Sequence, residues 1–123
     1  MSLINVNLTN NNITPNVNDY GNIIDNKIIY CDLSGTTITD NSFNLYLNLT
    51  NNTNSIQKCN VLFRNNGLNP IVNTLEINNR RSNHFINNRD TSSTTSQMTN
   101  QEFIITYDDT GIYTSISTIR KYD

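Results

Sequence analysis

Hydrophobic and polar residues alternate in short runs along most of the chain, a pattern that predicts β-strands. In residues 42–49 four apolar side chains alternate with Asn44, Tyr46 and Asn48, so one face of this strand is apolar. Strand patterns also cover residues 4–8, 22–31, 56–64, 71–78, 84–87, 101–107 and 112–119, with 22–31 either broken by a bulge or divided into two strands.

The segments between these runs are rich in turn-forming residues. Asn65-Asn66-Gly67 is a strong hairpin-turn signal, because these residue types tolerate positive φ. Residues 32–40 are expected to form a turn region, with an edge strand at 36–39 as the alternative, and residues 88–100 a long polar loop. Residues 10–18, which include Pro15, are expected to form a loop or arm.

These patterns predict a fold without long helices. We expect an all-β protein of about eight short antiparallel strands, arranged as a β-sandwich or small barrel. The length of the chain predicts that residues 1–123 form a single β domain. In this domain we expect residues 1–20 to supply an N-terminal strand followed by an arm.

Composition supports this fold class and restricts the partners. Only 35% of the 123 residues are apolar, 26 are Asn, and there is no Ala, the strongest helix former. Only 15% are charged and the net charge is −2, which argues against nucleic acid or an anionic membrane as a partner. The segment Met1–Leu8 lacks the features of a signal peptide, so we expect synthesis in the cytoplasm of whatever cell makes the protein.

Cys31 and Cys59 both fall in predicted strands. We expect two buried free thiols, with one disulfide as the alternative, because no export signal is evident.

Candidate chemistry is sparse. Asp109-Thr110-Gly111 matches the catalytic triplet of dimeric aspartic proteases, but too little chain follows it, and a turn explains the same residues. His84 is the only histidine, and no short Cys or His spacing suits zinc. We therefore expect no enzyme activity, and assign no catalytic, cofactor-binding or metal-binding residue.

Interaction is better supported than catalysis. Arg80, Arg81 and Arg89 form the one basic cluster of the sequence. The cluster suits a carboxylate, a phosphate or an acidic patch on another subunit, and a solvated loop is the alternative. The candidate interaction residues are these three arginines and the outward-facing Tyr46, Leu62 and Tyr113.

Four segments of residues 58–116 follow one another in a recognisable pattern of strands and Asn-rich turns. They are Cys59-Asn60-Val61-Leu62-Phe63, Asn65-Asn66-Gly67-Leu68-Asn69-Pro70, Asn73-Thr74-Leu75-Glu76-Ile77-Asn78 and Gln101-Glu102-Phe103-Ile104-Ile105-Thr106-Tyr107-Asp108. In this pattern residues 58–116 resemble a β domain found in phage tail-fibre, tail-tip and head-fibre proteins. The family usually has a glycine where this chain has Arg80-Arg81.

The resemblance implies a structural virion protein at the particle surface, either a head-decoration or minor capsid protein or a fibre or tail component. Its partners would be further copies of itself, with a trimer favoured, or a major capsid or tail protein. The alternative function is a receptor- or glycan-binding module of a phage fibre that contacts a host surface glycan through residues 79–100. A dimeric aspartic protease is a remote alternative.

Overall fold

The computed structural model describes residues 2–15, 27–47, 55–77, 79–81, 87–89, 97–107 and 112–122. These residues contain strands and turns but no helix, which confirms the all-β prediction, and none of them forms a helix that could cross a membrane. The strands are β1 (Ser2–Thr9), β2 (Asn12–Pro15), β3 (Lys27–Asp32), β4 (Ser42–Leu47), β5 (Ser55–Arg64), β6 (Ile71–Ile77), β7 (Arg80–Arg81), β8 (Asn87–Arg89), β9 (Met98–Tyr107) and β10 (Ile112–Tyr122).

The described strands belong to one mixed sheet in the order β7-β6-β4-β2-β1-β3-β5-β9-β10-β8. The prediction of antiparallel strands is wrong for five of the nine neighbouring pairs, since β1/β3, β3/β5, β2/β4, β4/β6 and β8/β10 are parallel. A sandwich of two separate sheets or a closed barrel is not confirmed. The C-terminal hairpin is as expected, with β9 and β10 antiparallel.

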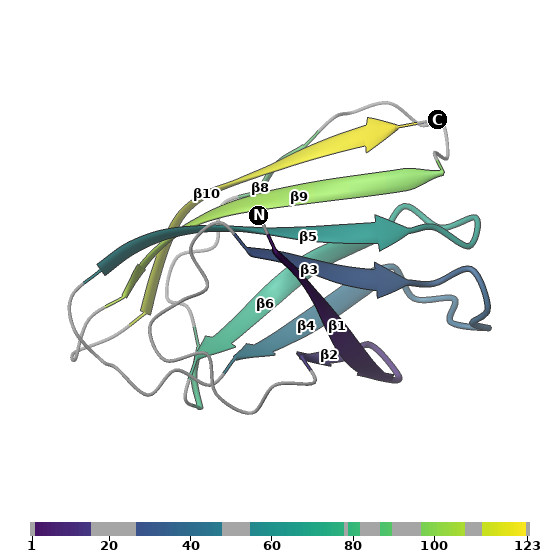
Figure 1. Ribbon diagram of the computed structural model, residues 1–123, viewed down its shortest axis with the longest axis horizontal. Coiled ribbons are helices and arrows are strands. Elements are labelled where there is room, and N and C mark those ends of the chain that lie inside the picture. Colours follow the sequence, from purple (N-terminus) through teal and green to yellow (C-terminus); the bar gives the residue numbers. More distant parts are fainter. Residues whose placement is uncertain are drawn as a thin grey trace.

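Four of the five parallel pairs arise because the chain winds in three successive coils. Each coil has one strand in each half of the sheet: β1 and β2, then β3 and β4, then β5 and β6 (Figure 1). In one half Ser2 lies beside Lys27 and Lys27 beside Cys59, so equivalent parts of successive coils are neighbours. β1 joins the halves, because its first part pairs with β3 and its second part pairs with β2.

The core lies between the two halves of the folded sheet. In Figure 1, β4 and β6 run behind β3 and β5. The rings of Phe43 in β4 and Phe63 in β5 meet with centroids 5.2 Å apart and planes tilted by 44°. Burial of such aromatic pairs contributes strongly to a core of this size. The fully buried side chains around them include Ile13, Ile29, Leu33, Leu45, Leu75, Ile77, Phe103 and Ile105.

A buried glutamine also connects the two halves. Gln101 in β9 donates through Nε2 to the carbonyl oxygen of Val72 in β6 (3.0 Å), and its Oε1 accepts from the Val72 N–H (2.8 Å). The second N–H of the same amide donates to Ser117 Oγ in β10 (2.7 Å). The Gln101 side chain thus supplies Val72 with the two hydrogen bonds that a neighbouring strand would make.

The loops of the three coils stack on one another at the end of the molecule shown on the right of Figure 1, and asparagine amides join them. Asn11 Nδ2 donates to the Asp40 carbonyl (2.7 Å), and Asn41 Nδ2 donates in the same way to the Asn69 carbonyl (3.2 Å). Asn66 Nδ2 reaches Ile38 O and Thr36 Oγ1, each at 3.2 Å. Each Asn amide therefore ties one coil to the next.

Several predicted elements differ from the observed ones. The expected loop over residues 10–18 contains β2, so residues 12–15 of the expected arm are paired with β1. The turn Asn65-Asn66-Gly67 does not close a hairpin, because β5 pairs with β3 and β9 whereas β6 pairs with β4 and β7. Residues 36–39 form no strand, and the segment 88–100, expected to be a loop, has strand residues at both ends, because β8 extends to Arg89 and β9 begins at Met98.

Candidate interaction surface

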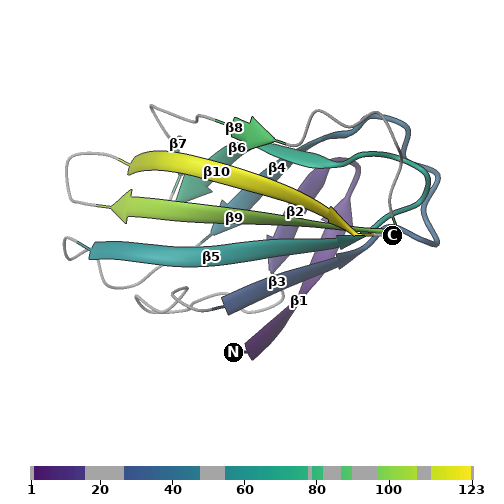
Figure 2. The same cartoon turned by 90° about the horizontal axis from the view of Figure 1, so that it is seen from above.

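The outer face of the half-sheet β1, β3, β5, β9 and β10 is the surface seen from above in Figure 2. Successive side chains of a strand point to opposite faces, so residues next to the core residues in each strand lie on this outer face. One row across the face contains Tyr30, Leu62, Asn100 and Arg120, which are register partners in turn. We call this surface the outer face.

Apolar side chains gather on the outer face. Within the described residues the exposed large hydrophobic side chains are Leu3 (64% exposed), Ile104 (39%) and Tyr122 (49%), and all three lie on this surface. Half-buried apolar side chains on the same face connect two of them. Ile28 is the register partner of Leu3, Tyr30 of Leu62 and Met98 of Tyr122, so a diagonal apolar band crosses the face from β1 to β10. Ile104 lies outside this band, opposite Lys58. An exposed apolar band of this kind is typical of an interaction site.

Four of the five charged side chains of the outer face lie beside a group of opposite sign, and the fifth is Arg120, whose register partner is Asn100. Lys58 Nζ is 3.4 Å from Glu102 Oε2. Asp32 is the register neighbour of Arg64. The pKa of Asp32 is below its usual value because the Ser34 hydroxyl and N–H donate to its carboxylate, with a smaller effect of Arg64. The outer face therefore has little net charge.

The exposed surface on the other side of the molecule is formed by β2, β4, β6 and β7, and we call it the opposite outer face. It is polar, and several of its side chains are hydrogen-bonded to one another. Asn44 Nδ2 donates to Asn12 Oδ1 (2.9 Å), and the Asn73 amide donates to Ser42 Oγ (2.7 Å). Arg81 Nε donates to Glu76 Oε1 at 2.9 Å. This surface has the character of a solvated face, in contrast to the outer face.

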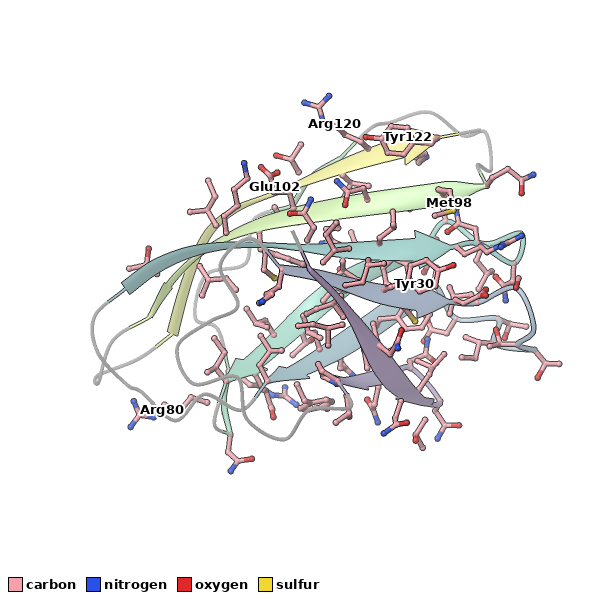
Figure 3. The ribbon with its side chains drawn as sticks, viewed as in Figure 1. Tyr30, Arg80, Met98, Glu102, Arg120 and Tyr122 are labelled. Atoms are coloured by element: carbon pink, nitrogen blue, oxygen red, sulfur yellow. The ribbon has the colours of Figure 1, made fainter. Side chains whose placement is uncertain are left out.

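The six predicted interaction residues do not form one site. Leu62 is half-buried on the outer face, whereas Tyr46 is half-buried on the opposite one. Arg80 and Arg81 are exposed in β7, and Figure 3 shows Arg80 far from Glu102, Arg120 and Tyr122. Arg89 and Tyr113 belong to β8 and β10, but their side chains lie outside the described part of the chain.

The predicted candidates for chemistry are mostly outside the described residues. This holds for Asp109-Thr110-Gly111 and His84, and for most of the 79–100 segment assigned to a glycan. Among the described residues, no three His, Cys, Asp or Glu side chains gather in a way that could hold a metal.

Cys31 and Cys59 are buried thiols that form no disulfide, which confirms the favoured prediction. Cys31 is the register partner of Phe63, whereas Cys59 is the partner of Lys27, so the two thiols lie at different levels along the neighbouring strands. Burial raises the pKa of Cys31 to about 12, with a smaller contribution from Asp32. A thiol with this pKa stays protonated and is a poor nucleophile.

Sequence reasoning missed most of the outer face. Ile104 could have been found, because it stands between Phe103 and Ile105 and must therefore point away from the core. Leu3, Tyr30 and Tyr122 lacked such a signal, because their place on one shared face depends on the parallel pairing of β1 with β3 and on the position of β10.

Taken together, the outer face can bury apolar area against another surface of low net charge, and the described residues present no constellation for covalent chemistry. No protein-family model matches the chain, and no match was found among curated proteins or solved structures.

Proposed function

We propose that this chain is a structural protein of a virus particle, either a head-decoration or minor capsid protein or a fibre or tail component, and that it works through protein–protein contacts. The observation that carries the contact function is the diagonal apolar band on the outer face that runs from Leu3 through Tyr30 and Leu62 to Tyr122. Exposed apolar side chains that are scattered singly need no explanation, whereas a shared patch is typical of a surface that another protein covers.

The virus particle enters this proposal through the resemblance of residues 58–116 to phage fibre and tail domains. The folded sheet fits such a role, because β4 and β6 pack on β3, β5 and β9 in the manner of a β-sandwich, and we propose this class for the fold. Rigid sheets of this kind present a fixed surface, which repeated contacts in a particle require.

The proposal is tested in cells that make the particle. We expect the protein in stoichiometric copies in purified particles by quantitative mass spectrometry. Ile104→Glu and Leu62→Glu place a charge on the outer face and should lower incorporation at least about tenfold, which corresponds to ~1.4 kcal/mol.

Thr14→Glu is the matched control, because Thr14 is an exposed residue of β2 on the opposite outer face. Thr14→Glu should be incorporated into particles in the same number of copies as the unchanged protein. Absence of the protein from purified particles, or equal incorporation of all three variants, would contradict the proposal. Circular dichroism of each purified variant establishes that it still folds.

A further inference from the structure

The register of the outer face places complementary groups at its two sides. β3 contributes Tyr30 and Asp32, while β10 contributes Arg120 and Tyr122. Tyr30 and Arg120 belong to the same row, because Tyr30 is aligned with Leu62, Leu62 with Asn100 and Asn100 with Arg120. In the next row Asp32, Arg64, Met98 and Tyr122 are aligned in the same way.

This arrangement is complementary to itself. A two-fold axis that runs along the strands between β5 and β9 lays β3 of one copy over β10 of the other, which is the aligned packing common for two sheets. Tyr30 then faces Arg120 of the second copy, a cation–π pair. Asp32 faces Tyr122 of the second copy, whose hydroxyl can donate to the carboxylate. By symmetry each contact occurs twice.

The charges of the face also favour a second copy. The acidic groups Glu102 and Asp32 already lie beside Lys58 and Arg64, so a strongly charged partner would gain little. With the axis between β5 and β9, the strands that overlap are β3, β5, β9 and β10, whereas β1 lies beyond β10 of the second copy. Four strands about 4.8 Å apart and six residues long cover roughly 400 Å². Two copies would bury about 800 Å², the size of a weak, transient interface.

We propose that the part of the outer face formed by β3, β5, β9 and β10 is a two-fold interface with a second copy of this chain, in which Tyr30 of each copy stacks on Arg120 of the other. The inference rests on the proposed contact function and names its first partner. The small area makes the dimer a concentration-dependent one.

Sedimentation velocity over a dilution series up to about 1 mM measures the self-association. A monomer–dimer equilibrium is expected for the unchanged protein and for Thr14→Glu, and a monomer for Leu62→Glu. Tyr30→Ala and Arg120→Ala should each raise the dimer Kd about tenfold, and the double variant should raise it little further. A monomer at every concentration overturns the proposal, as does a dimer in which the two substitutions act independently.

A single introduced cysteine tests the geometry separately. Leu62→Cys lies next to the axis, so the two copies of this thiol would be about 11 Å apart, given sheets about 10 Å apart. A bis-maleimide of similar length should link two chains of Leu62→Cys, whereas Thr14→Cys should stay unlinked. The native Cys31 and Cys59 are buried and give a low background. Linkage of Thr14→Cys instead of Leu62→Cys would place the interface elsewhere and overturn the inference.

The two proposals fail in different ways. If the protein is monomeric but Ile104→Glu is still lost from particles, the outer face binds another protein, and only the two-fold inference is overturned. If the protein dimerises through the outer face but is absent from particles, the inference stands and the proposed virion function is wrong.

Discussion

The side chain of Gln101 binds both backbone polar groups of Val72, with hydrogen bonds of 3.0 Å to its carbonyl oxygen and 2.8 Å from its N–H. The two residues belong to opposite halves of the folded sheet, β9 and β6. Val72 is buried, so these backbone groups have no access to water in place of the amide. Gln101 therefore stabilises the closure of one half over the other.

Gln101→Ala is expected to lower the free energy of unfolding by about 2–4 kcal/mol, because it leaves the Val72 groups and the Ser117 hydroxyl buried without this partner. Denaturant unfolding measures the change. Asn100→Ala is the control, since Asn100 is the adjacent residue and bonds Asn60 on the outer face, at 3.1 Å. It should cost less than about 1 kcal/mol. Equal losses for both variants would contradict a closing role for Gln101.

Two glycines in coil loops provide a matched pair. Gly67 has φ +97°, in the region that L-residues rarely adopt, whereas Gly35 is outside that region, and an added Cβ meets nothing within 4 Å at either. Gly67→Ala should therefore lower stability by about 1 kcal/mol, and Gly35→Ala should leave it unchanged or raise it slightly. Thermal unfolding of the two variants distinguishes backbone strain from crowding, because only strain differs between the sites.

The buried thiol of Cys31 makes stability depend on alkaline pH. Its pKa of about 12 in the folded protein lies above the ordinary value of 9.0, so the unfolded chain loses the proton first. The stabilisation from Cys31 is complete below pH 9 and is lost as the pH rises from about 9 to about 12. Cys31→Ala should unfold with a smaller dependence on pH in this window, as measured by denaturant unfolding.

The same environment should hide the thiol from reagents. In the folded protein at pH 8 an aromatic disulfide reagent should react slowly with Cys31, and both cysteines should react at once in guanidinium chloride. Fast labelling of Cys31 without denaturant would show that it is more accessible than the packing of β3 indicates.

Asp32 gives the opposite dependence at acid pH. Its pKa is lowered in the folded protein, chiefly by the hydroxyl and the N–H of Ser34, which donate to Oδ1 at 2.6 and 2.9 Å. The stabilisation is present above the ordinary value of 3.8 and is lost as the pH falls through the lowered pKa. Asp32→Asn should show a smaller loss of stability between pH 5 and pH 2, and the difference is expected to be small because Asp32 is exposed.

Local patterns in the sequence were sufficient to place most strands. Alternation predicted the strand at residues 42–49, and the structure has β4 there with Phe43, Leu45 and Leu47 buried. β2 was missed because turn-forming residues flank Asn12-Ile13-Thr14-Pro15 on both sides, and because the segment itself is too short to show a repeated alternation of apolar and polar residues. Its place between β1 and β4, not its own composition, makes it a strand.

The pairing of strands could not be predicted from the same patterns. Alternation shows which face of a strand is buried, but it contains no information on which strand lies beside it. The turn at Asn66-Gly67 has the residues of a hairpin, yet it carries the chain from one half of the sheet to the other. The outer face depends on that pairing. Leu62 was therefore recognised as outward-facing, while Tyr30 and Arg120, which lie in the same row across the face, were not.

The three coils have a consequence for how such a chain can vary in length. Each coil adds one strand to each half and meets the next through similar asparagine bonds, such as Asn11 to Asp40 and Asn41 to Asn69. An inserted repeat of about 30 residues could therefore lengthen the protein by one strand spacing, roughly 4.8 Å, in the way that solenoids grow. Homologues that differ by whole repeats would keep the same first and last strands.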